Sequence, residues 1–193
     1  FAKLPVGKVR YGIMLREDGI VMDDGTTARF SENHYVMTTT TGNAASVMSK
    51  LEDWLQTEWP ELKVYLTSVT EEFATISING PYASDLVKKI FPHTDFSNQN
   101  FPHMNFKNVK IGNVNCRIMR ISFTGEKCYE INIPSSYAKS LWSKCFELGK
   151  EFNITPYGTE AMHVLRAEKG FIIVGQETDG SITPIDLDMN WIV

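Results

Sequence analysis

Hydrophobic residues recur three and four positions apart in four segments of this chain, the spacing of an amphipathic helix. The clearest segment starts at Asn43, a residue that suits a helix N-cap, and ends at Pro60, which cannot continue a helix. The same spacing predicts a shorter helix over 84–90 and a longer one over 137–151. A last helix is expected over 159–169, where Gly170 ends it.

Short β-branched or alternating apolar segments between turn residues predict strands. They cover residues 11–15, 20–22, 26–30, 35–41, 64–69, 73–78, 109–111, 116–121 and 129–133. Asp23-Asp24-Gly25 is interpreted as a turn, and 64–69 is expected to pair with 73–78. Hairpins that alternate with single helices, without regular β-α-β crossovers, predict an α+β fold with largely antiparallel sheets.

A polar segment bounded by prolines, residues 92–103, is the best candidate for a boundary within the chain. Residues 1–91 are then expected to form a first α+β half, and residues 104–193 a second, each ferredoxin-like in its pattern. The chain starts without Met and ends without a polar tail, so it is expected to be a fragment of a longer polypeptide. The predicted core consists of Val47, Leu51, Trp54, Phe73, Ile76, Leu141, Trp142 and Phe146.

The composition is that of a globular protein, with 42% hydrophobic and 22% charged residues among 193. A net charge of −4 without a Lys/Arg block argues against nucleic-acid binding. No apolar run approaches the roughly 18 residues of a spanning helix, and no signal peptide is visible. We therefore expect no membrane contact and a cytoplasmic location. The three cysteines have no C-x-x-C spacing, which indicates reduced thiols rather than disulfides or a zinc site.

The common motifs of nucleotide and metal chemistry do not occur. There is no G-x-G-x-x-G and no G-x-x-x-x-G-K-[ST], and the four histidines are scattered. No serine or cysteine nucleophile motif is present either. These observations argue against a dinucleotide site, a metal site and acyl transfer.

Carboxylates at two places remain as candidate chemistry. Asp23 and Asp24 are adjacent, so on a strand they point to opposite faces and only one addresses a given pocket. The alternative is that they belong to a simple turn beside Gly25. Glu130 lies in an apolar strand, where it is either a solvent-facing residue of an alternating pattern or a buried acceptor.

Arg166 and the closing segment are two further features, each weak when taken alone. Arg166 stands near the end of the last helix, where a surface arginine that favours the helix dipole is the simpler interpretation. Residues 175–179 and Thr183-Pro184 follow it.

Taken in order, residues 122–131, 165–170, 175–177 and 183–184 resemble the aminomethyltransferase family, the folate-dependent T-proteins of glycine cleavage and their relatives. Within this family, residues 9–19, 37–43 and 51–60 are similar to the alpha subunits of heterotetrameric sarcosine oxidases. The resemblance extends over nearly the whole chain.

The resemblance implies a tetrahydrofolate site. Asp24, or alternatively Asp23, matches the aspartate beside the folate N5 and N10 atoms. Glu130 matches the glutamate that holds the pterin ring, and a carboxylate accepts two hydrogen bonds from such a ring at once. Arg166 matches the arginine near the pterin, where its planar cation hydrogen-bonds or stacks.

Two positions depart from the T-protein pattern. Thr40 stands where T-proteins carry an asparagine, and Phe123 where they carry a tyrosine. Both remain candidate folate-binding residues, although Phe123 lacks the hydroxyl donor and retains only the capacity to stack.

The resemblance also implies a reaction. Proteins of this kind oxidise sarcosine at a flavin in another subunit, and tetrahydrofolate captures the methylene carbon of the imine as 5,10-methylenetetrahydrofolate. The chain is then part of an oxidoreductase, with other sarcosine oxidase subunits as partners and with NAD and flavins bound elsewhere. We expect it to be inactive alone. The alternatives are a freestanding folate-dependent aminomethyltransferase or demethylase, and a non-catalytic folate-binding scaffold.

Overall fold

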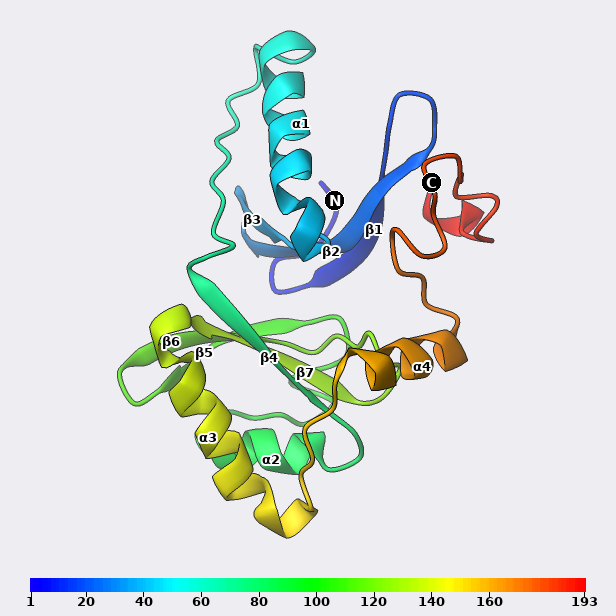
Figure 1. Ribbon diagram of the computed structural model, residues 1–193. Coiled ribbons are helices and arrows are strands. Elements are labelled where there is room, and N and C mark those ends of the chain that lie inside the picture. Colours follow the sequence, from blue (N-terminus) through cyan, green and yellow to red (C-terminus); the bar gives the residue numbers. More distant parts are fainter.

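Two antiparallel sheets lie one above the other in the computed structural model, which describes residues 1–193, and helices cover their outer sides (Figure 1). The first sheet has the order β1-β2-β3, with β1 (Val9–Leu15), β2 (Val21–Ser31) and β3 (His34–Met37). The second has the order β4-β7-β6-β5, with β4 (Phe73–Asn79), β5 (Phe106–Ile111), β6 (Val114–Met119) and β7 (Cys128–Pro134).

Four α-helices surround the sheets. Helix α1 (Ala44–Thr57) lies above the first sheet, whereas α2 (Ala83–Ile90) and α3 (Ala138–Gly149) lie below the second (Figure 1). Helix α4 (Thr159–Lys169) flanks the second sheet, and the chain then runs to the first. The short 3-10 helices are η1 (Thr41–Asn43), η2 (Ser135–Tyr137), η3 (Lys150–Phe152) and η4 (Asn190–Ile192). None of the helices has the length and hydropathy that crossing a bilayer requires.

The α+β prediction with antiparallel sheets is confirmed, since every strand pair is antiparallel. The four helices and the β5–β6 hairpin also lie where the pattern predicted them. Gly170 has φ of 78° and ends α4 in the left-handed conformation. The division of the chain into two halves at 92–103 stays a prediction. Strands β4 and β7, which come from either side of this segment, pair in one sheet.

The predicted turn at Asp23-Asp24-Gly25 is wrong. These residues lie inside β2, an 11-residue strand in which Gly25 pairs with Gly12 of β1. A Cβ on Gly25 would lie 1.8 Å from the carbonyl oxygen of Thr38, so the strand needs glycine for close packing rather than for a turn. The consequence is that both aspartates are held by a regular ladder.

Replacing Gly25 by Ala is expected to destabilise the fold by about 1–3 kcal/mol or more, because the neighbour of the new methyl group is backbone and must move. Urea unfolding measures the loss. Gly42→Ala is the matched control, since a Cβ there meets nothing within 4 Å. Equal stabilities of the two variants would contradict the close approach.

The predicted strand over 64–69 is also wrong, because residues 58–72 connect α1 to β4 without a strand. Strand β4 pairs only with β7, so residues 64–69 leave its outer edge open rather than pairing with it, and Tyr65 is 93% exposed. Strand β3 ends at Met37 rather than at residue 41, and the threonines that follow pass into η1.

The main core lies between the second sheet and the helices α2 and α3. It contains 16 buried residues, among them Val87, Phe91, Ile118, Tyr129, Ile131 and Leu141. Of the predicted core, Val47 and Leu141 are buried. Leu51, Trp54, Phe73, Ile76 and Phe146 are only partly buried. Trp142 is 48% exposed, because α3 buries a narrow stripe that includes Leu141 and Cys145.

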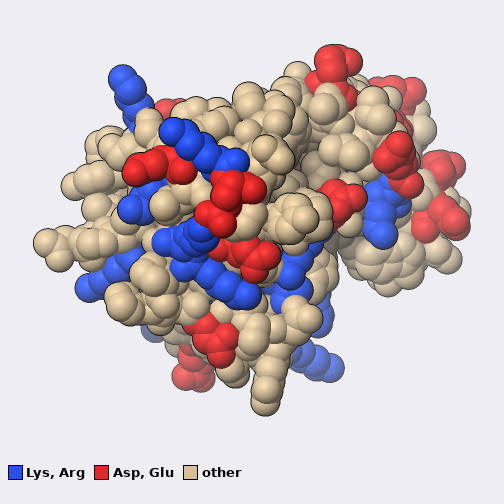
Figure 2. All heavy atoms as spheres, turned by 90° about the horizontal axis from the view of Figure 1, so that it is seen from below, with Lys and Arg blue, Asp and Glu red and all other residues tan.

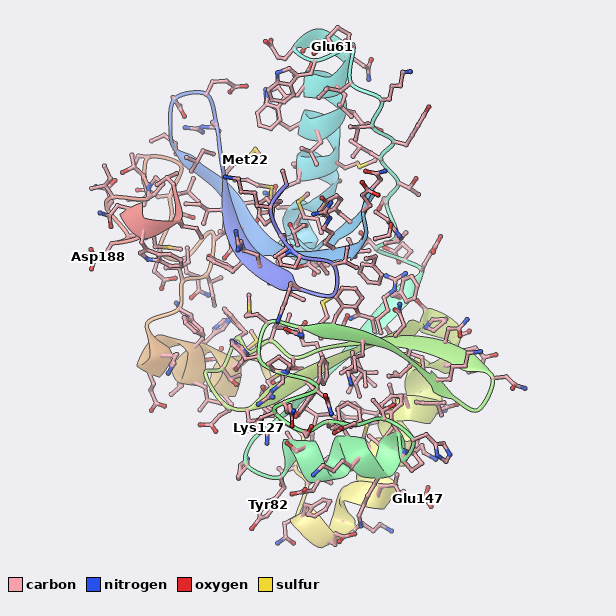
Figure 3. All side chains as sticks on the ribbon, turned by 180° about the vertical axis from the view of Figure 1, so that it is seen from behind. Met22, Glu61, Tyr82, Lys127, Glu147 and Asp188 are labelled. Carbon is pink, nitrogen blue, oxygen red and sulfur yellow. The ribbon has the colours of Figure 1, made fainter.

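A smaller apolar cluster joins the two sheets. Val9 and Ala28 of the first sheet pack with Phe106 and Met119 of the second, and with Ile121 just after β6. We call the sides of the two sheets that meet in this cluster their inner faces. In Figure 3, side chains from both sheets fill the space between them.

The lower face of the molecule, on the side of α2 and α3, carries basic and acidic side chains that alternate (Figure 2). No broad area of a single charge covers the face in this view.

Candidate functional site

Asp23 and Asp24 point to opposite sides of β2, as strand geometry predicts. Asp23 is fully buried, with 0% exposure. Its carboxylate accepts hydrogen bonds from Asn43 Nδ2 at 3.1 Å, from the backbone N–H of Thr40 at 3.4 Å and from that of Asp24 at 2.8 Å. Asp23 therefore ties β2 to the start of α1, and Asn43 serves this contact rather than capping the helix.

Asp24 lies on the inner face of the first sheet. Val9 pairs with Ala28 and Ile13 with Asp24, so Asp24 shares its face with the apolar cluster between the sheets. Its Oδ2 accepts a hydrogen bond from the hydroxyl of Tyr11 at 2.8 Å. Burial raises the pKa of Asp24, and the Tyr11 bond partly opposes this effect.

Tyr11 was not among the residues singled out by sequence reasoning. The register of the β1–β2 hairpin, in which Tyr11 pairs with Thr26, places it next to Asp24 on the same face. Burial is also the main cause that raises the pKa of Tyr11, so the hydroxyl stays a neutral donor at ordinary pH.

Glu130 occupies the inner face of the second sheet. It pairs with Ser77 of β4 and with Met119 of β6, and Met119 belongs to the cluster between the sheets. Its neighbours Tyr129 and Ile131 point into the main core on the other face. The strand therefore alternates, with Glu130 on the inner face and its two neighbours in the main core.

The Glu130 carboxylate has no hydrogen-bond or ion-pair partner among the side chains and backbone of the protein. Burial, without a compensating partner, raises the pKa of Glu130 from 4.5 to about 7. Glu130 is partly exposed, so solvent or a ligand reaches its carboxylate. A largely desolvated carboxylate without a donor is costly in a folded protein, and such a group is typical of a ligand site.

Small polar side chains surround Glu130 on this face. The hydroxyl of Ser77 lies 3.2 Å from Cys128 Sγ, and Thr124 donates to Asn79 Oδ1 at 2.9 Å. Asn79 Nδ2 donates to the hydroxyl of Tyr157, which comes from the segment before α4. The identity of these neighbours depends on which strands are adjacent, so the sequence alone gave no sign of them.

Arg166 is buried, contrary to the simpler interpretation of a surface arginine, with 7% exposure. Its guanidinium bonds Glu177 at 2.7 Å, Gln176 Oε1 at 2.9 Å and the carbonyl of Phe171 at 3.0 Å. Only Nε is left as a buried donor without a partner. Arg166 thus attaches the segment 171–177 to α4, and the role of Gln176 and Glu177 is to accept its hydrogen bonds.

The remaining candidates occupy separate places. Thr40 reaches Asp23 through its backbone N–H, on the α1 side of β2. Phe123 is partly exposed beside the buried Thr124. The structure shows no hydrogen bond from Thr40, Phe123 or Arg166 to Asp24 or Glu130.

The three cysteines are buried free thiols. Burial raises the pKa of Cys128 to about 12 and that of Cys145 to about 11, so both stay un-ionised at neutral pH. A thiol in this state is a poor nucleophile.

Glu130→Gln is expected to change how stability depends on pH. Because the pKa of Glu130 is raised from 4.5 to about 7, the unfolded chain ionises first as pH rises, and stability is lost between these values. The loss of stability is on the order of 3 kcal/mol, and the variant lacks it. Urea unfolding of both proteins at pH 4.5, 6 and 8 measures the difference. Parallel pH profiles would show that Glu130 is not desolvated.

Comparison with known proteins shows similarity over the full length of the chain. Residues 1–193 match the GCVT N-terminal domain. The chain is 55% identical over 194 residues to a sarcosine oxidase subunit alpha from Corynebacterium sp. (strain P-1), covering all of this chain and 20% of that protein. It is 46% identical to the sarcosine oxidase subunit alpha of Rhizobium meliloti, again over 20% of that protein.

More distant relatives are aminomethyltransferases. The enzyme of Thermoanaerobacter pseudethanolicus is 31% identical, and the chain spans 50% of its length. The crystal structure of the glycine cleavage system aminomethyltransferase T from Bartonella henselae superposes with a TM-score of 0.83 at 24% identity, over all of this chain and 49% of that one. The fold is therefore that of about half of an aminomethyltransferase chain.

Proposed function

Because the chain belongs to the GCVT N-terminal domain family, we propose that it is a folate-binding module of a sarcosine-oxidising enzyme. The observation that carries this proposal is the desolvated carboxylate of Glu130, which faces the space between the sheets without a donor from the protein. The proposal concerns the activity of a larger protein, since the chain spans 20% of the sarcosine oxidase subunits that it matches.

Glu130 fits the pterin ring of tetrahydrofolate. The ring carries an amino group and an adjacent N–H, and these two donors match the two oxygens of one carboxylate. Binding of such donors favours the ionised carboxylate, so the ligand offsets the desolvation that raises the pKa of the empty site. Arg166 is proposed to contribute the face of its guanidinium, Phe123 to stack, and Thr40 to contact the folate.

Asp24 is the proposed catalytic residue, and Tyr11 positions it through the 2.8 Å hydrogen bond. Tetrahydrofolate, when bound, would supply the nucleophilic nitrogens N5 and N10, which would take over the methylene carbon of the imine to give 5,10-methylenetetrahydrofolate while the amine of the imine leaves as glycine. The Asp24 carboxylate stabilises a cationic amine nearby and moves a proton between nitrogens. Because burial raises its pKa, Asp24 takes up a proton more readily than an exposed aspartate does.

The wider assembly is part of the same proposal. Sarcosine is oxidised at a flavin held by other sarcosine oxidase subunits, NAD binds elsewhere, and the complex is cytoplasmic. The chain alone is expected to hold an incomplete folate site and to be inactive. A freestanding aminomethyltransferase is the second candidate, supported by the 31% identity to such an enzyme.

Substitution of Glu130 tests the folate site directly. Glu130→Gln is expected to weaken tetrahydrofolate binding about 10–100-fold, because two hydrogen bonds to a charged acceptor are lost or weakened. Glu126→Gln is the matched control, since Glu126 is exposed in the turn just before β7. Equilibrium dialysis measures both affinities, and equal affinities would remove Glu130 from the site.

The proposed reaction has its own test in the complete oxidase. Free formaldehyde is measured per hydrogen peroxide during sarcosine turnover, with and without tetrahydrofolate. Capture of the methylene lowers the ratio towards zero. A ratio that folate does not change would leave a binding module without transferase activity.

A further inference from the structure

The side-chain amide of Asn79 joins three segments of the chain that border Glu130. Its Oδ1 accepts a hydrogen bond from the hydroxyl of Thr124 at 2.9 Å, and its Nδ2 donates to the hydroxyl of Tyr157. The same Nδ2 donates to Ser77 Oγ at 3.2 Å. Asn79 ends β4, Thr124 lies in the segment before β7, and Tyr157 precedes α4, so one side chain connects positions that are 45 and 78 residues away from it.

The β4–β7 ladder places this junction beside Glu130. Asn79 pairs with Cys128 and Ser77 with Glu130, so all four side chains lie on the inner face of the second sheet. Burial is the main cause that raises the pKa of Tyr157, and Cys128 and Glu130 add to this effect because they lie near its hydroxyl. The three segments therefore meet on the side of the sheet that carries the Glu130 carboxylate.

Two partners of Asn79 are close in sequence to residues of the proposed folate site. Thr124 directly follows Phe123, and Tyr157 stands two residues before α4, the helix that carries Arg166. Neither Phe123 nor Arg166 is hydrogen-bonded to Glu130, so other contacts must set where their segments lie. The amide of Asn79 supplies such contacts, because it links the β4–β7 pair to both segments.

We propose that Asn79 is a positioning residue for the site at Glu130, where its amide holds the segment with Phe123 and the segment before α4 at the inner face. The effect on folate rests on the proposed function, whereas the enclosure of Glu130 does not depend on which ligand binds. Asparagine suits this role, because one short side chain carries an acceptor oxygen and an NH₂ group with two donors.

Loss of the amide is expected to admit water to the Glu130 carboxylate. Burial is the cause that raises the pKa of Glu130 to about 7. The titratable groups beside it are Cys128 on β7 and Tyr157 before α4, and burial keeps both neutral at pH 7, while β4 and β6 place uncharged side chains opposite it. Asn79→Ala should therefore lower the pKa of Glu130 towards its ordinary 4.5, since hydration favours the charged form.

The experiment titrates the Glu130 carboxyl in the purified full-length protein through its infrared C=O band, which is identified by its absence in Glu130→Gln. The test variants are Asn79→Ala, Asn79→Gln, Thr124→Val and Tyr157→Phe. Asn100→Ala is the matched control, because Asn100 is an exposed asparagine whose side chain donates to Asp95. In the complete oxidase, formation of 5,10-methylenetetrahydrofolate gives the half-saturating tetrahydrofolate concentration and the rate at saturation.

Asn79→Ala is expected to lower the midpoint of the Glu130 titration by about one pH unit or more, and Asn100→Ala to leave it unchanged. The half-saturating folate concentration rises about 10-fold in Asn79→Ala. The rate at saturation stays near that of the native enzyme, because Asp24 lies on the other sheet. Asn79→Gln keeps the donors and the acceptor and recovers part of both effects, and the variants that remove one hydroxyl show smaller shifts in the same direction.

A less stable Asn79→Ala protein with an unchanged titration and an unchanged half-saturating concentration would show that Asn79 only supports the fold, which overturns the inference. If the native protein binds no folate, the proposed function fails, and the titration alone decides. A lowered midpoint then supports the positioning role, and an unchanged midpoint overturns it. If Asn79→Ala does not fold, Thr124→Val and Tyr157→Phe are judged by the same criteria.

Discussion

Asp24→Asn is expected to slow methylene capture by about 10²–10⁴-fold, the range of general acid–base catalysis, while tetrahydrofolate still binds. The amide keeps the shape of the side chain and can still accept the Tyr11 hydrogen bond, but it neither takes up a proton nor carries negative charge. The measurement is the rate of 5,10-methylenetetrahydrofolate formation in the complete oxidase, beside folate affinity by dialysis.

Tyr11→Phe gives a graded comparison for the same site. It removes the hydrogen bond that lowers the pKa of Asp24, so the acid limb of the pH–rate profile is expected to move to higher pH. Asp53→Asn, on the exposed side of α1, is the control and should change neither rate nor profile. A full rate in Asp24→Asn would indicate that the chain binds folate without taking part in the chemistry.

Asp23→Ala is expected to destabilise the protein by about 3–5 kcal/mol. Its carboxylate accepts three hydrogen bonds in a fully buried position, and each donor left without a partner costs about 1–3 kcal/mol. The estimate is below the full sum because Asn43 also donates to the carbonyl of Met22 at 3.3 Å. Urea unfolding measures the loss.

Substitutions of the two adjacent aspartates are thus expected to have different effects, a slower reaction at Asp24 and a less stable fold at Asp23. Asp24→Asn is expected to fold with nearly native stability, whereas Asp23→Asn should recover part of the stability lost in Asp23→Ala, because an amide still accepts one or two of the bonds. If Asp23→Ala were as stable as the native protein, the attachment of β2 to α1 would have to depend on other contacts.

Local patterns were sufficient to predict most elements of the fold. Helix α4 and its end at Gly170 follow from spacing and from one glycine, and the β5–β6 hairpin follows from two short apolar runs. The errors arose where a distant neighbour decides the outcome. The segment Asp23-Asp24-Gly25 has the composition of a turn, and only the close approach of Gly25 to Thr38 shows why a strand has glycine there.

In the candidate site, too, local patterns predicted some features, and contacts with distant residues decided the others. Alternation along β7 left Glu130 as either a solvent-facing residue or a buried acceptor. The pair Asp23–Asp24 was expected to split between faces only if it lay on a strand. The role of Tyr11 could be seen only from the register of the β1–β2 hairpin. The partners of Arg166 could be seen only after the segment 171–177 was found folded back against α4. Those contacts join positions that no sequence period connects.

One contact of the first sheet has a consequence for the order of events during synthesis. The backbone N–H of Val21 donates to the carbonyl of Ile182, and Arg16 bonds the carbonyl of Gly180, 164 positions away. On a ribosome the β1–β2 hairpin emerges early but stays incomplete until residues 180–182 have left the exit tunnel. The second sheet with α2 and α3, which lies within 73–149, is finished before that. Distant closures of this kind slow folding, so the first sheet is expected to complete its contacts last.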